Sequence, residues 1–352
     1  MAYTTIDDPS VYFQTAIYAG NGSTQSITND GNSDLQPDWI WFANRTNAPR
    51  DRIIIDSTRG VDLSLYSNQT KGDQSLTDVM SSFNSDGFSL ESNVRANESS
   101  QNHVAWQWKA NGGTTASNSD GSITSTVQAN TTAGFSIVTY TGTGSTATVG
   151  HGLGAKPDVY IVKNREEEQD WMGYFNGTAS DPETDGLRLN TTDAITDASS
   201  FWNDTAPTSS VFTVNTSTNV NKSSIDYIAY CFTSIQGYSK FGGYTGTGSE
   251  DGPFVYLGFK PQWILFKNTG AAEEWVLQDT TRNPNNPVTK NIRIDSNIAE
   301  GDASSIDIDF LSNGFKNRSD QAQINSSGVT YVYMAFAEHP FVSSEGVPTT
   351  AR

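Results

Sequence analysis

The sequence has one cysteine, few basic residues and no long apolar run. Cys231 is the only cysteine in 352 residues, so no intramolecular disulfide can form and the fold must depend on packing and assembly. The 21 Lys and Arg against 39 Asp and Glu give a formal net charge of -18, which would repel a phosphate backbone or an anionic lipid surface. No apolar run approaches the roughly 20 residues of a membrane span. We therefore expect no nucleic-acid partner and no membrane insertion.

The first residues of the chain also lack a basic region followed by an apolar stretch, so no secretory signal is predicted and we expect synthesis in the cytoplasm. Triplets such as Asn97-Glu-Ser99 are frequent. Without a secretory signal, we expect them to reflect an Asn- and Thr-rich composition and not glycosylation.

Helix-forming sequence is scarce as well. The chain is dense in Ser, Thr, Asn, Asp and Gly, and its aromatic fraction is 11%. Ser, Thr, Asn, Asp and Gly suit the turns that join short strands, whereas aromatic residues suit the strands themselves. The length exceeds what one hydrophobic core usually supports. The composition therefore predicts an all-β protein with two or three domains.

One sequence unit recurs three times. Its opening element, an aromatic residue followed by a glycine-rich turn, occurs at Tyr18–Gly22, Tyr140–Gly144 and Tyr244–Gly248. The copies are 122 and 104 residues apart (140 minus 18, 244 minus 140). Recurrence at a fixed order and spacing indicates a duplicated structural unit.

Each copy continues with a strand that begins after a proline, at Pro37–Arg45, Pro157–Arg165 and Pro261–Asn268. The β-branched and aromatic run in each predicts a strand buried on both faces, with Asn at the exit turn.

A closing strand completes each copy, and its three versions are aligned on Ala105, Ala229 and Ala335: His103–Trp108, Tyr227–Phe232 and Tyr333–Glu338. Just before it, Asp-Gly or Asn-Gly between aromatic residues predicts a hairpin at Phe83–Phe88 and Phe310–Phe315, which the middle copy lacks.

These elements predict three tandem, related antiparallel β-sandwich domains of jelly-roll or lectin-like type. The first covers residues 1–110, the second 134–236, and the third 237–352 with the C-terminal tail. Residues 111–133 are predicted to form an extended connector rich in Gly, Ser and Thr.

Catalytic patterns are weak, so we expect no enzyme. His103, His151 and His339 lie in different parts of the repeat, without carboxylates or cysteine at ligand spacing. The charge run Glu166–Glu168 is typical of a solvated loop. No cofactor is predicted. Calcium is the alternative, because Asp302–Asp309 offers oxygen ligands, but its period-2 pattern also fits a strand with one wet face.

Three tryptophans, Trp171, Trp202 and Trp275, lie in or near predicted loops. An aromatic ring can stack on the apolar face of a sugar while Asn and Asp side chains bond its hydroxyls. The three are candidate glycan-binding residues, with core packing as the alternative.

Eight stretches are rich in Gly, Ser or aromatic residues: Asp120–Val127, Ala133–Gly142, Gly150–Gly154, Trp202–Asn203, Ser209–Phe212, Gly237–Gly242, Gly252–Phe259 and Tyr331–Glu338. They resemble repeats in tail-fibre and other virion proteins of marine bacteriophages, of the cyanophage and pelagiphage type. The resemblance spans about residues 12–341. It implies a location in the virion, after assembly in the host cytoplasm, and no known catalytic residues.

The resemblance favours a tail-fibre or tail-tip adhesin that binds host envelope polysaccharide or lipopolysaccharide beside other virion proteins. The sequence contains no heptad or collagen-like shaft. That absence favours the alternative of a capsid decoration or head-fibre protein. A glycan depolymerase is the third hypothesis. By analogy with fibre and decoration proteins, we expect a homotrimer.

Overall fold

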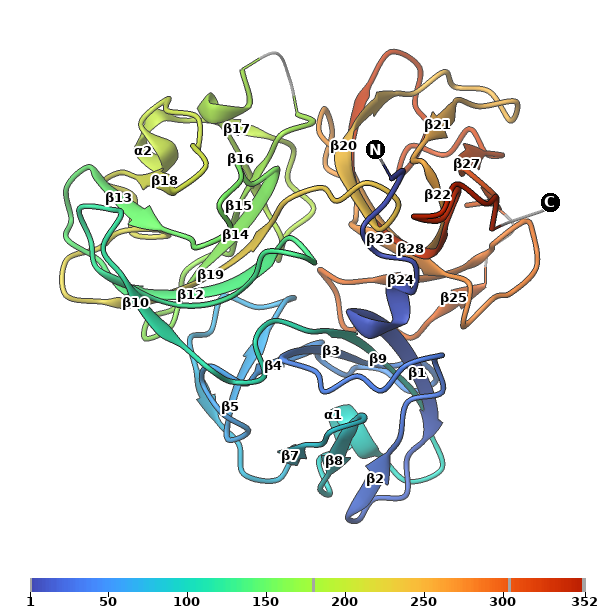
Figure 1. Cartoon of the computed structure of the whole chain (residues 1–352), viewed down its shortest axis with the longest axis horizontal. Coiled ribbons are helices and arrows are strands. Elements are labelled where there is room, and N and C mark those ends of the chain that lie inside the picture. The colour runs from blue at the N-terminus through green and yellow to red at the C-terminus, as the bar shows by residue number, and fades with distance from the viewer. Residues whose placement is uncertain (1, 179–180, 303–304, 350–352) are drawn as a thin grey trace.

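The computed structural model describes residues 2–178, 181–302 and 305–349. Strands account for 41% of the structure and helices for 4%, and six antiparallel sheets form roughly three sandwich-like units without a closed barrel. The all-β prediction is confirmed. The three units surround a common centre, and both chain ends lie beside the third unit (Figure 1).

The first unit pairs a large sheet with a small one. The large sheet contains, in spatial order, β1 (Phe13–Ala19), β9 (Asn102–Trp108), β3 (Trp39–Asn44), β4 (Ile53–Asp56), β5 (Leu63–Tyr66) and β6 (Gln74–Ser75). The small sheet contains β2 (Gln25–Ile27), β8 (Phe88–Leu90) and β7 (Met80–Phe83). The short helices are η1 (Pro9–Val11) and α1 (Val94–Asn97).

The second unit has a longer large sheet and only two strands in its small one. The large sheet contains β10 (Ala116–Asn118), β11 (Ser125–Asn130), β12 (Phe135–Thr141), β19 (Asp226–Phe232), β14 (Val159–Asn164), β15 (Met172–Phe175), β16 (Asp185–Arg188) and β17 (Thr196–Asp197). The small sheet contains β13 (Ala147–Gly150) and β18 (Val211–Val214). The short helices are η2 (Pro182–Thr184) and α2 (Ser199–Trp202).

The third unit repeats the arrangement of the first. Its large sheet contains β20 (Ser239–Thr245), β28 (Thr330–Pro340), β22 (Phe259–Asn268), β23 (Val276–Asp279), β24 (Lys290–Arg293) and β25 (Gly301–Asp302). Its small sheet contains β21 (Phe254–Tyr256), β27 (Gly314–Asn317) and β26 (Ile308–Leu311).

In all three large sheets, the closing strand lies between the opening strand and the strand predicted to begin at the proline. In the third unit that strand begins earlier, at Phe259, and Pro261 lies inside it at an irregularity of the pairing. The repeat predicted from the sequence is therefore a repeat of sheet topology. The predicted hairpins are also present, with Phe83 opposite Phe88 and Phe310 opposite Phe315.

The alignment of the closing strands, however, was wrong by two residues in the third copy. The opening tyrosines Tyr18, Tyr140 and Tyr244 lie opposite His103, Tyr227 and Tyr331. Tyr331, and not Tyr333, is thus the counterpart of His103, which restores the spacing of 104 residues (331 minus 227). A slip of two residues leaves every side chain on its original face, so hydrophobic alternation could not reveal it.

Each large sheet is buried on both faces. In β3, Trp39 and Trp41 point inward to a core that all three units share, while Ile40 and Phe42 face the small sheet. The other two units follow the same pattern, with Val159 or Trp263 directed toward the shared core. Three separate cores between sheets surround this central one. The three units consequently pack into one body around a shared core and are not independent tandem domains.

The extended connector expected over residues 111–133 instead contains β10 and β11. Both strands pair in register, β10 with β11 and β11 with β12, and they widen the large sheet of the second unit. Gln128 of β11 donates from Nε2 to Thr58 Oγ1 at 2.8 Å. This segment therefore packs against the first unit and does not act as a spacer.

Candidate functional site

Trp171 and Trp275 are buried where two units meet. We call each of these contact regions between neighbouring units a seam. Trp171 donates from Nε1 to the carbonyl oxygen of Tyr66 in the first unit at 2.8 Å. Trp275 donates likewise to the carbonyl of Arg188 in the second unit at 2.9 Å. Their solvent exposures are 0% and 1%. A ring enclosed on both faces cannot stack on a sugar, so the glycan-binding prediction for these two residues was wrong.

Trp202 is also buried, in the separate core of the second unit. It ends α2, and its Nε1 donates to the carbonyl of Asp185 at 2.8 Å. Tyr160 meets its ring edge-on, with the centroids 4.8 Å apart. Core packing, the alternative considered for all three tryptophans, is what the structure contains.

Arg52 makes the corresponding hydrogen bond from the first unit to the third, so all three pairs of units are connected in this way. It occupies the position before β4 that Trp171 and Trp275 occupy before β15 and β23, and it donates from Nε to the carbonyl of Arg293 at 3.1 Å. The three acceptors are equivalent in the repeat. Tyr66, Arg188 and Arg293 each lie, within their own unit, opposite the residue that follows Arg52, Trp171 or Trp275. Each unit thus donates a side-chain N–H to the equivalent backbone carbonyl of its neighbour.

The histidines and the cysteine do not form a reaction centre. His103 is buried and stacks on Tyr18 with centroids 5.5 Å apart. His151 is buried, and its Nδ1 accepts from the backbone N–H of Leu153 at 3.2 Å. Burial raises the pKa of the Cys231 thiol. His339 lines a cavity.

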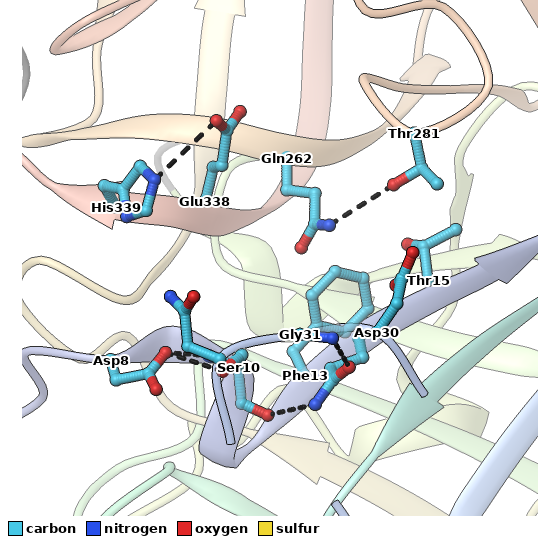
Figure 2. Close-up of a pocket in the computed structure, with 12 residues that line it drawn as sticks. Asp8, Ser10, Phe13, Thr15, Asp30, Gly31, Gln262, Thr281, Glu338 and His339 are labelled. Carbon is cyan, nitrogen blue, oxygen red and sulfur yellow. Dashed lines mark hydrogen bonds and ion pairs between the residues drawn. The ribbon is translucent and has the colours of Figure 1, made fainter. Parts of the chain in front are cut away.

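That cavity is a polar cleft of about 290 Å³ between the first and third units. Figure 2 shows Asp8 and Asp30 on one side and Gln262, Thr281, Glu338 and His339 on the other. The first group comes from η1 and the loop after β2, while the second comes from β22, β28 and the loop after β23. Two segments more than 200 residues apart therefore build one site.

The lower wall of the cleft is hydrogen-bonded throughout its loop. Burial raises the pKa of Asp8, but hydrogen bonds from Ser10, Ser33 and Asn32 outweigh it and lower the pKa overall. Gln14 fixes the loop above it, because its Oε1 accepts from the backbone N–H of Gly31 at 3.0 Å. A Cβ on Gly31 would lie 2.5 Å from that oxygen, so a side chain there would displace the Gln14 amide from this contact.

The upper wall carries an ion pair. Glu338 accepts from Lys260 Nζ at 2.7 Å, and His339 Nε2 lies 3.8 Å from the same carboxylate oxygen. Across the cleft, Thr15 is 3% exposed, and its hydroxyl has no hydrogen-bond partner among the described residues. The hydroxyl is thus an unsatisfied buried group behind the wall of the cleft.

The cleft has side chains that can bind a polar ligand. Carboxylates, amides and hydroxyls can bond the hydroxyls of a polar ligand. A glycosidase, by contrast, requires one carboxyl kept protonated by an elevated pKa, and the pKa of Asp8 is lowered. The strongly raised carboxyl, Asp295 with a pKa of about 7 owing to burial, is not among the residues that line the cleft.

Within the described residues, no group of three His, Cys, Asp or Glu side chains could hold a metal ion. The candidate calcium segment Asp302–Asp309 includes two positions, 303 and 304, that lie outside those residues. Asp309 is paired with Arg318 at 2.6 Å. No helix of the described chain is long and apolar enough to cross a membrane.

Sequence reasoning missed a structural asparagine in each copy. Asn97, Asn221 and Asn325 are fully buried, and each Oδ1 accepts from a backbone N–H in the glycine-rich opening turn. The recurring Asn-X-Ser was visible but was attributed to composition. Its place before each closing strand was the signal that the residue pins that turn.

Residues 8–340 match the model of one family, described as a domain of unknown function (DUF7483). No curated protein and no solved structure matches the chain. The match begins at Asp8 of the cleft and ends directly after His339, so it spans all three units.

Proposed function

Because the chain belongs to the DUF7483 family, whose model spans the whole three-unit body, we propose one function for that body as a unit: a structural protein of a bacteriophage particle, in a tail fibre or tail tip, that binds saccharides of the host envelope. The polar cleft between the first and third units carries the proposal. We also propose that the three sandwich-like units are jelly rolls of lectin-like type.

The composition of the cleft supports a saccharide ligand. It combines carboxylates with the amide of Gln262 and the hydroxyl group of Thr281, which are the kinds of group that orient a polyhydroxylated molecule. A volume of about 290 Å³ suits a small ligand or one end of a longer chain. The net charge of -18 disfavours nucleic acid as an alternative.

The experiment measures binding of purified protein to an array of bacterial lipopolysaccharides and capsular polysaccharides. Asp30→Asn and Glu338→Gln should each weaken binding at least tenfold, because each removes an ionised acceptor. Glu345→Gln, an exposed change of the same kind elsewhere, should leave it unaltered. Absence of the protein from purified virions by mass spectrometry would refute the particle location.

A capsid decoration or head-fibre protein is the second candidate. The ring of three units around one centre (Figure 1) favours it, since a pseudo-threefold body fits a threefold mount on a shell. Particle imaging separates the two, because density on the head lattice would reject the tail position. The third hypothesis, a depolymerase, predicts shortened polysaccharide chains after incubation.

A further inference from the structure

The third unit exposes two aromatic side chains on the outer face of its small sheet. Phe254 and Tyr256 of β21 are 46% and 48% exposed, whereas Val255 between them packs toward the core of the unit. Alternate residues of a strand lie on the same face, about 7 Å apart. The two rings therefore form one surface, which we call the aromatic platform.

The fold does not require this platform. The equivalent face of the first unit carries Ser26, whose hydroxyl lies 2.9 Å from that of Ser89. In the second unit the corresponding strand presents Thr148, which contacts Ser122. Two copies of the same architecture thus fold with small hydroxyl side chains at these positions. The exposed aromatic residues of the third copy are therefore not needed for folding and are candidates for binding.

A groove of about 350 Å³ adjoins Tyr256, and Tyr3 and Lys240 line it. The two tyrosine hydroxyl groups lie 3.1 Å apart, and Tyr3 donates to the carbonyl of Gly258 at 2.8 Å. Lys240 donates from Nζ to the carbonyl of Tyr256 at 2.7 Å and covers the ring at 5.5 Å from its centroid. One side of the ring is thereby held in place.

From this geometry we infer that the aromatic platform binds a saccharide, with a sugar ring stacked on Tyr256 or Phe254 and its hydroxyls bonded by the tyrosine hydroxyls and Lys240. The inference rests on the proposed function and adds a site separate from the cleft. Aromatic rings flanked by polar groups suit a ligand that is apolar on its faces and polar at its rim.

The size of the platform argues against a protein partner. A stable protein interface takes about 800 Å² from each side, and the platform offers two half-exposed rings. Charged groups border it, since Lys316 lies opposite Phe254 and pairs with Asp251 at 2.6 Å. The remaining surface is therefore polar, as a small saccharide site requires.

The test uses Tyr256→Trp in the full-length protein. All eight native tryptophans are at most 3% exposed, so the new indole is the accessible one, and iodide should quench it selectively. Lipopolysaccharides and capsular polysaccharides that bind on the array should reduce this quenching. The double variant Phe254→Ala/Tyr256→Ala should lose at least tenfold in affinity, and Ile17→Ala, an equally exposed apolar residue, should lose nothing.

Each result has a distinct meaning. Affinity lost in the double variant but retained in Ile17→Ala, together with protection of the indole, supports the platform. Unchanged affinity in the double variant, or an indole that stays quenchable while polysaccharide is bound, overturns the platform and leaves the cleft as the site. If the wild-type protein binds no polysaccharide on the array, the proposed function itself fails.

Discussion

The substitution Tyr230→Phe removes a hydroxyl that forms two hydrogen bonds across a seam, the longer of which is accepted from Arg59 Nη2 of the first unit at 3.4 Å. Tyr230 of the second unit donates from its hydroxyl to Asp56 Oδ2 of the first unit at 2.8 Å. Asp56 also accepts from Arg59 Nε at 2.6 Å, and the side chains of this ion pair are 0% and 1% exposed. Loss of the hydroxyl therefore leaves a fully buried carboxylate with one donor fewer.

The expected cost follows from the charge of the acceptor. A hydrogen bond to a charged buried group contributes roughly 1.5–3 kcal/mol, about twice a neutral one. Phe keeps the ring that packs on Trp39 at 4.8 Å between centroids, so the packing loss should be small. We expect the free energy of unfolding to fall by roughly 2 kcal/mol.

Tyr160→Phe is the matched control. Tyr160 lies on the adjacent strand and is fully buried, but its hydroxyl has no hydrogen-bond partner among the described residues. Its removal should be neutral or slightly stabilising, because an unsatisfied buried hydroxyl costs free energy. Urea unfolding, followed by circular dichroism, measures both variants. Equal effects would refute the role of the seam, and a separate transition for the first unit would refute the shared core.

Three further predictions concern protons and assembly. Burial lowers the pKa of His103 to about 4, below its unfolded value of 6.5, so stability is complete above pH 6.5 and should fall by about 3 kcal/mol toward pH 4; urea unfolding of His103→Phe should show that component removed. Burial lowers the pKa of Lys163 to about 7, so the unfolded chain holds more protons above pH 7 and stability should rise by about 2 kcal/mol from pH 7 to 9, with a flatter profile in Lys163→Met. For the predicted homotrimer, light scattering should give three times the chain mass of 38.1 kDa; a mass near 38.1 kDa at micromolar concentration would exclude a self-sufficient trimer.

The repeat could be predicted because its signals are local. An aromatic residue, a glycine turn and a proline before an apolar run each leave a pattern within a few residues. The assignment of Asn44 to an exit turn also depended on local geometry, and its Oδ1 accepts from the backbone N–H groups of Thr46 and Asn47. Short-range chemistry of this kind is legible in a single sequence.

The seams and the cleft could not be predicted, because they join residues far apart in the chain. Trp171 and the carbonyl that it bonds are separated by 105 positions, and the acceptor is backbone, which any residue supplies. The equivalent donor in the first unit is Arg52, a different residue type. A tryptophan that follows an acidic loop looks exposed in the sequence, yet its position at a strand start directs it into the neighbouring unit.

The three seams share a position but not a chemistry, and this difference shows where the copies were free to diverge. Tyr230 bonds Asp56, and Trp106 donates from Nε1 to Asp279 at 2.9 Å. At the third seam the equivalent residues are Met334 and Phe175, both in the shared apolar core. Polar and apolar solutions are thus both compatible with closure, provided that no buried charge is left unpaired. A carboxylate at the centre, such as Asp56 or Asp279, therefore needs its donor from the neighbouring unit, whereas an apolar pair at the same position needs none.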